Sequence, residues 1–145
     1  YVGASWPQFT DGMDVGNGGF SLRSKALMSL CQAPDVVAAH PEDVAIGRTW
    51  RTDLERQGMR FAPREVADLF SAERASDPAR TFGFHGVWNM PAALGLDEFW
   101  TRYRDLDDRS SIRPDFWPMV RSMIGSPRGM TRAMRMISDR FLGTR

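Results

Sequence analysis

Two neighbouring carboxylates, Glu42 and Asp43, are the residues in this sequence best suited to proton transfer. They follow Pro41, which fits the first position of a helix, so both are expected in a first helical turn. Carboxylates there complement the helix dipole and cap free N–H groups, which is a structural role. Aimed into a cleft, the same carboxylate can act as a general base toward an attacking hydroxyl group. The pair alone leaves both interpretations open.

A glycine-rich segment, residues 16–21, precedes this pair and is called the glycine loop below. Its three glycines fall within four positions, which permits positive φ angles and close approach of another group. It has neither a Gly-x-Gly-x-x-Gly pattern nor a Lys-Ser/Thr pair, so it is not a phosphate-binding fingerprint. It is either a tight bend or a backbone surface pressed against a ligand. In the second case the candidate contacts are Asn17, Gly18, Gly19 and Ser21.

A third candidate, His85, lies between aromatic residues and glycines in the sequence FGFHG. Such a histidine often has only a structural hydrogen-bonding role. As a metal ligand it would need carboxylate partners, and an oxygen-rich site of that kind suits Mn²⁺ or another divalent ion.

The elements expected to position these residues alternate between short strands and helices, which predicts an α/β fold up to about residue 90. Ser24 suits the N-cap of a helix over 25–32, and the helix opened by Pro41 is expected to end at Gly58. A short strand is predicted over 59–62. Pro63 then opens another helix, whose apolar residues are Val66, Ala67, Leu69 and Phe70. A soft boundary separates residues 1–90 from a helical extension, residues 91–145.

Composition and charge limit the classes of function. The 145 residues are 42% apolar and 26% charged, and no run approaches the roughly 18 apolar residues of a membrane span. The single cysteine, Cys31, excludes an internal disulfide framework and fits a reducing compartment. Residues 1–100 carry nine basic and thirteen acidic side chains, whereas residues 101–145 carry ten and five. Without interleaved aromatic and basic residues in the basic part, no nucleic-acid partner is expected.

Residues 127–142 predict a basic amphipathic helix. One stripe is apolar and the remaining circumference is rich in arginine, including Arg128, Arg132, Arg135 and Arg140. The favoured interpretation is that the apolar stripe covers the protein's own core, and the alternative is peripheral contact with an anionic membrane surface. The stripe consists of Met130, Met134, Ile137 and Phe141.

Four segments follow one another in a specific order: GNGGFSLRS from Gly16, PED from Pro41, RFAP from Arg60 and FGFHG from Phe82. This series resembles an uncharacterised, glycosyltransferase-like family of bacterial and fungal proteins over about residues 1–90. More distantly, it is similar to the C-terminal, acceptor-side half of GT-A glycosyltransferases such as the β-1,4-galactosyltransferases. Those enzymes have a Gly-Gly-x-Ser segment, then a Gly-Glu-Asp turn that opens a helix, then a metal-binding histidine.

The resemblance implies sugar transfer from a nucleotide-sugar donor to a saccharide or glycolipid acceptor, with inversion at the anomeric carbon. Asp43 would be the catalytic base and Glu42 a hydrogen-bonding partner of the acceptor. Gly18 and Gly19 would border the donor sugar, and His85 would complete a site for Mn²⁺ or Mg²⁺.

The sequence departs from the galactosyltransferase pattern at Pro41, where those enzymes have glycine, and in the longer gap from Asp43 to His85. Their metal-binding Asp-x-Asp segment should precede the catalytic acid. The acids Asp105, Asp107 and Asp108 instead follow an amphipathic helical pattern late in the chain, so we interpret them as a solvated helix end. The nucleotide-binding half is therefore expected upstream of residue 1, and this chain alone is expected to be inactive.

The alternative from another functional class is a non-catalytic remnant of such a fold that binds carbohydrate or protein. Trp6, Phe20 and Trp88 could then stack on sugar faces, and Trp88 is a candidate substrate contact in the enzyme as well. In either case the expected location is the cytoplasm, free or peripheral to the inner face of the membrane.

Overall fold

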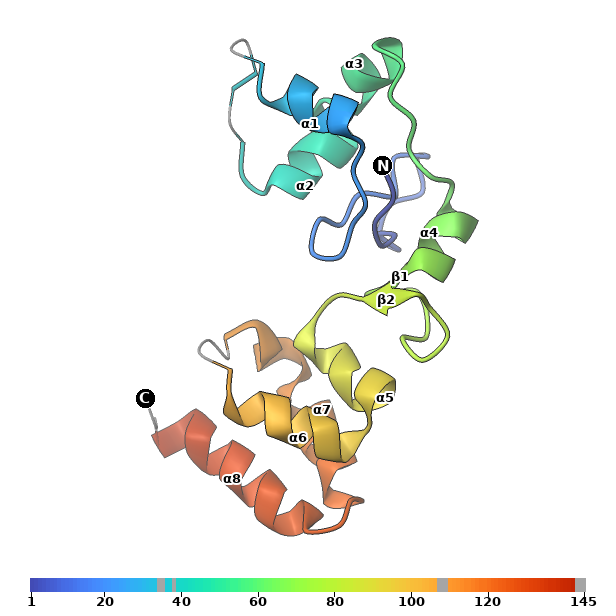
Figure 1. Ribbon diagram of the computed structural model, residues 1–145. Helices are drawn as coiled ribbons and strands as arrows, with labels where there is room; N and C mark the ends of the chain where they lie inside the picture. Colours follow the sequence, from blue (N-terminus) through green and yellow to red (C-terminus); the bar gives the residue numbers. More distant parts are fainter. Residues whose placement is uncertain (34–35, 38, 107–109, 143–145) are drawn as a thin grey trace. The chain divides into compact units, whose positions relative to one another are not determined.

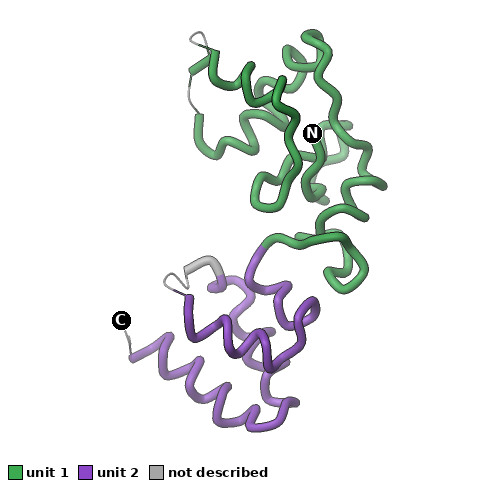
Figure 2. The backbone as a smooth tube through the Cα atoms, in the orientation of Figure 1, with its two compact units in different colours: residues 1–85 green, residues 86–145 purple. Residues whose placement is uncertain are grey.

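The computed structural model describes residues 1–33, 36–37, 39–106 and 110–142 (Figure 1). The chain divides into two compact units, residues 1–85 and residues 86–145 (Figure 2). The sequence had placed a soft boundary near residue 90. All the regular secondary structure among the described residues of the second unit is helical.

Among its described residues, the first unit contains four α-helices, one π-helical segment and two short strands. In chain order these are α1 (Lys25–Cys31), α2 (Glu42–Val44), η1 (Ala45–Thr49, π), α3 (Arg51–Arg56), α4 (Arg64–Phe70), β1 (Ser71–Ala72) and β2 (Gly83–Phe84). The second unit contains η2 (Val87–Asn89, 3₁₀), α5 (Met90–Leu94), α6 (Leu96–Arg104), η3 (Ser110–Asp115, 3₁₀), α7 (Phe116–Ile124) and α8 (Gly129–Leu142). Helices with a small parallel sheet confirm the α/β class in its broad sense.

Two residues that the sequence placed at helix ends in the first unit are confirmed there. The Ser24 side chain accepts a hydrogen bond from Leu27 N and caps α1, and Gly58 ends the α3 segment with φ of 86°. The strand predicted over residues 59–62 is wrong. These residues have no regular structure and are held in part by Ala62 N, which donates to Tyr1 O at 2.9 Å.

The beginning of the chain holds the glycine loop in place. Isolated antiparallel bridges join Val2 to Leu22 and Ser5 to Val15. The Tyr1 hydroxyl donates to the carbonyl oxygens of Gly16 at 2.6 Å and of Asn17 at 2.9 Å. These bonds fix the loop on both sides of its first glycine.

Apolar packing in the first unit is modest. Leu27, Ile46 and Leu54 form its buried cluster, which joins α1, η1 and α3. The helix predicted after Pro63 is confirmed as α4, in which Ala67 is buried and Leu69 is 69% exposed. The helix is short and meets the core through one small residue.

The two strands are parallel, with Ser71 opposite Gly83 and Ala72 opposite Phe84. The amide of His85 donates to Ala72 O at 2.8 Å, which extends the pairing by one bond. Parallel strands end at the same edge of a sheet. The residues that follow them, Glu73 and His85, therefore start from neighbouring positions.

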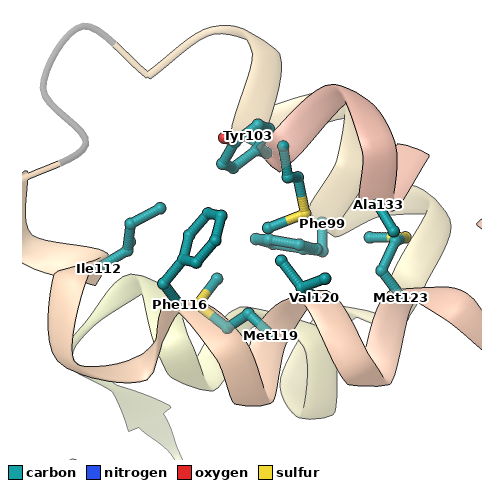
Figure 3. Close-up of a cluster of buried hydrophobic side chains, with 9 residues drawn as sticks. Phe99, Tyr103, Ile112, Phe116, Met119, Val120, Met123 and Ala133 are labelled. Atoms are coloured by element: carbon teal, nitrogen blue, oxygen red, sulfur yellow. The ribbon is translucent and has the colours of Figure 1, made fainter. Parts of the chain in front are cut away.

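The second unit has the larger apolar core, built by α6, η3, α7 and α8 (Figure 3). Its buried residues are Phe99, Tyr103, Ile112, Phe116, Met119, Val120, Met123, Ala133 and Met136. Five members of this set, Phe99, Tyr103, Phe116, Val120 and Met123, recur at helical spacing in the sequence.

The predicted core stripe of α8 is wrong. The helix buries Gly129, Ala133 and Met136, whereas Met130 and Met134 are exposed. The physical reason is close helix packing: a Cβ at Gly129 would overlap carbonyl oxygens at the end of α7, so α8 approaches through its small residues. No helix among the described residues has the length and apolarity needed to cross a bilayer.

Candidate functional site

The glycines of the glycine loop allow neighbouring side chains to lie directly against the loop backbone. None of Gly16, Gly18 and Gly19 has a positive φ, so that part of the expectation is wrong. A Cβ at Gly16 would lie 2.5 Å from the Trp6 ring, and a Cβ at Gly18 would lie 2.6 Å from Glu42 Oε1. The groups pressed against this backbone are the protein's own side chains.

Asp43 connects the glycine loop to the start of α2. Its Oδ2 accepts a hydrogen bond from Gly18 N at 3.3 Å, and its Oδ1 accepts one from Val44 N at 2.8 Å. The side chain is half-buried, and no cationic group in the described ranges forms an ion pair with it. Asp43 is thus a fixed carboxylate whose charge is met by backbone N–H groups.

Glu42 has a different environment. Arg23 Nη2 donates to its Oε1 at 2.9 Å, and this bond lowers the pKa of Glu42. Arg23 Nε also donates to Ser21 Oγ at 3.2 Å, and Ser21 Oγ donates to Gly18 O at 3.2 Å. Glu42 is therefore neutralised by a guanidinium that is itself tied to the glycine loop, so Asp43 is the better placed of the two acids to accept a proton.

Asn17 is buried and bridges the loop to a residue that the sequence did not single out, Glu73. Asn17 Oδ1 accepts from Gly19 N at 2.9 Å, and Asn17 Nδ2 donates to Glu73 Oε2 at 3.0 Å. Burial raises the pKa of Glu73, an effect opposed by electrostatic interactions with His85 and Arg74. Glu73 directly follows β1, and His85 directly follows β2. Only knowledge that these two strands pair in parallel could have identified Glu73 as a neighbour of the site.

His85 lies against the second glycine of the Gly18-Gly19 pair. A Cβ at Gly19 would overlap three atoms of its imidazole ring. A Cβ at Gly18 would lie 3.0 Å from Asp43 Cβ. Asp43 and His85 are 42 positions apart in the sequence, yet they contact consecutive residues of the glycine loop. The structure therefore brings Glu42, Asp43 and His85 to the glycine loop.

A divalent-cation site is not formed by these residues alone. In the part of the chain that the structure describes, no three side chains of His, Cys, Asp or Glu are grouped so that they could hold a metal ion. Mg²⁺ and Mn²⁺ need several oxygen ligands, and His85 offers one nitrogen. Asp107 and Asp108, from the aspartate-rich segment, lie outside the described residues.

The aromatic residues considered for sugar stacking make contacts within the protein. Trp6 is only 7% exposed, so it is not available to stack on a sugar, and the half-buried Phe20 stacks on Phe70 with ring centroids 5.3 Å apart. Trp88 belongs to the second unit and packs against its apolar core, whereas the other candidates belong to the first.

Comparison with known families gives one match. Residues 1–85 match a family described as "Protein of unknown function (DUF5672)", which covers more than half of the chain. The chain belongs to the DUF5672 family. The DUF5672 region ends where the first unit ends, so it contains the glycine loop, Asp43, Glu73 and His85 but not Trp88. No curated protein and no solved structure matches the chain.

Proposed function

We propose that the DUF5672 unit is the acceptor-side half of a GT-A-like glycosyltransferase, in which Asp43 activates the acceptor hydroxyl for attack on a nucleotide sugar. One observation carries the proposal. Asp43 is a carboxylate without an ion-pair partner among the described residues, fixed by two backbone N–H groups and next to Gly18, whose neighbour Gly19 lies against His85. The order of these segments along the chain supports the same interpretation, through the resemblance to glycosyltransferases.

The reaction would proceed as a single displacement. Asp43 takes the proton of the acceptor hydroxyl while the oxygen bonds to the anomeric carbon. The bond from that carbon to the nucleoside diphosphate oxygen breaks, and the anomeric configuration inverts. The donors Gly18 N and Val44 N hold the carboxylate in one orientation, so little reorganisation is needed when the hydroxyl arrives.

The neighbouring groups would bind the two sugars. Glu42 keeps 55% of its side chain exposed while paired with Arg23, and its free oxygen can accept from acceptor hydroxyls. Asn17, Gly18, Gly19 and Ser21 form the backbone surface beside the donor sugar. The half-buried hydrogen bond from Asn17 Nδ2 to Glu73 Oε2 would help to hold this surface in place.

The test is acceptor-dependent release of nucleoside diphosphate by the full-length gene product, with Asp43→Asn as the variant. Loss of the base should lower kcat about 100-fold or more with an unchanged fold. Asp53→Asn is the matched control, since it makes the same chemical change in an exposed ion pair with Arg56. Near-normal turnover by Asp43→Asn would remove the assignment, and saccharide binding without any turnover would favour the non-catalytic alternative.

A further inference from the structure

The helices α7 and α8 carry a second apolar surface besides the one that faces the core. Trp117 is 54% exposed, Met134 64% and Phe141 63%, which is unusual for large apolar side chains in a folded unit. We call the exposed set the α7–α8 apolar face. Its members are Trp117, Ile124, Met130, Met134, Phe141 and Leu142.

The spacing of these residues makes stripes. Trp117 and Ile124 are seven positions apart on α7, and Met130, Met134 and Phe141 follow at intervals of four and seven on α8. The rings of Trp117 and Phe141 lie 6.4 Å apart and join the two stripes at one end.

The core uses other residues of the same helices. On α7 they are Phe116, Met119, Val120 and Met123, which Figure 3 shows clustered with Phe99 and Tyr103 of α6. On α8 they are Ala133 and Met136. The exposed side chains are therefore additional to a core that is complete without them.

The charge around this face is positive. Residues 116–142 contain five arginines and one aspartate, a balance of +4. The aspartate, Asp139, pairs with Arg135 at 2.8 Å. Arg121 and Arg128 are exposed and have no acidic partner within the described ranges. They remain available to a negatively charged partner.

One arginine of α8 does not belong to this surface. Arg132 pairs with Asp97 of α6, and its guanidinium lies 5.9 Å from the centre of the Trp100 ring. Its side chain is only 15% exposed. Arg132 holds α8 against α6, so it cannot be used to test charge on the face.

We propose that the α7–α8 apolar face seats the second unit on an anionic lipid bilayer. The apolar side chains would enter the boundary between headgroups and acyl chains, and Arg121 and Arg128 would bind lipid phosphates. A second copy of the chain fits this face less well, because pairing it with itself would bring two surfaces of the same positive sign together. This inference does not depend on the proposed function.

The test is cosedimentation of the 145-residue chain with vesicles at low salt. The wild type should bind phosphatidylcholine vesicles that contain phosphatidylglycerol, should bind pure phosphatidylcholine weakly, and should be released by added salt. The double variant Met134→Ser/Phe141→Ser should bind at least about tenfold more weakly. Because both residues are exposed, circular dichroism should show an unchanged fold.

Two double variants that lose the same charge distinguish binding through the α7–α8 apolar face from attraction by net charge alone. Arg121→Gln/Arg128→Gln should weaken binding about 25-fold. Arg56→Gln/Arg80→Gln removes the same charge from exposed positions of the first unit and should leave binding within about twofold.

Three results would overturn the proposal. The first is no binding to anionic vesicles at low salt. The second is equal loss of binding in both arginine pairs, which would mean that net charge alone attracts the lipid. The third is lipid-free self-association that Met134→Ser/Phe141→Ser abolishes, because the face would then be an interface between protein chains.

Discussion

Substituting Gly19 with alanine tests whether the glycine loop and His85 are in direct contact. Gly19 does not have a positive φ, so the backbone accepts alanine without strain. The nearest obstacle is the imidazole of His85, because the new Cβ would overlap three of its ring atoms. The ring cannot avoid a methyl group by moving one end, so the whole side chain must be displaced.

The magnitude follows from two opposed effects. Replacing glycine at a compatible position stabilises a protein by about 0.4–1 kcal/mol through the unfolded state. Overpacking of a well-filled contact costs about 1–3 kcal/mol. We expect Gly19→Ala to lower the free energy of unfolding by about 1–2 kcal/mol, since the overlap exceeds the entropic gain.

A double-mutant cycle with His85→Ala isolates this contact. Without the imidazole, Gly19→Ala should be neutral or stabilising, which gives a coupling energy of about 2 kcal/mol. The measurement is urea unfolding followed through resolved amide signals of residues 1–85, so that unfolding of the second unit does not enter.

Gly12→Ala is the matched control for the cycle. Gly12 has φ of 78°, and no atom lies within 4 Å of the position that a Cβ would occupy there. Gly12→Ala should therefore lower the free energy of unfolding by about 1 kcal/mol through backbone strain alone, and His85→Ala should not reduce this loss. Additivity of Gly19→Ala and His85→Ala within about 0.5 kcal/mol would refute the contact.

Three further predictions concern other contacts. Asn17→Ala removes the two hydrogen bonds that this buried amide makes with Gly19 N and Glu73 Oε2, and it should lower the free energy of unfolding of the first unit by about 1–3 kcal/mol in urea titration; no loss would contradict the bridge. Hydrogen bonds from Arg48 lower the pKa of Asp11 from 3.8 to about 2, so its contribution to stability is present above 3.8 and is lost as the pH falls through about 2. In Arg48→Gln the pKa of Asp11, measured by carboxyl NMR, should return toward 3.8, and an unchanged value would exclude the pair. Met136→Ala should cost about 2–5 kcal/mol and Met134→Ala less than about 0.5 kcal/mol, and the reverse order would contradict the register of α8.

Local signals predicted much of the fold because they act over a few residues. Ser24 caps α1, and Gly58 ends the α3 segment, as the sequence indicated. The core of the second unit was also visible, since α6 and α7 bury residues at ordinary helical spacing.

The buried face of α8 could not be predicted from the size of its apolar side chains. Met130 and Met134 form the more apolar stripe, but the helix packs through Gly129 and Ala133, which allow close approach to α7. Which of these two sets of residues is buried depends on how closely α7 packs against the helix, and the sequence of α8 alone does not show this. The short strand expected over residues 59–62 failed for a related reason, because a strand needs a pairing partner that sequence alone does not show.

The candidate site was predicted in part. The sequence identified Asp43, the glycine loop and His85, and the structure places these distant segments in contact. It did not identify Glu73, because the parallel pairing that brings this residue to the loop is a long-range feature. It also assigned stacking to Trp6, whose ring instead fills the space beside Gly16.

The central claim is that the acceptor saccharide binds at Asp43, beside the glycine loop that His85 also contacts. The most direct measurement is an NMR titration of the isotope-labelled chain with a panel of acceptor saccharides. We expect the amide signals of Gly18, Gly19 and Val44 and the ring signals of His85 to shift together, with one dissociation constant, and Asp43→Asn to weaken this binding. Shifts confined to other residues, or separate dissociation constants for the loop and for His85, would contradict it.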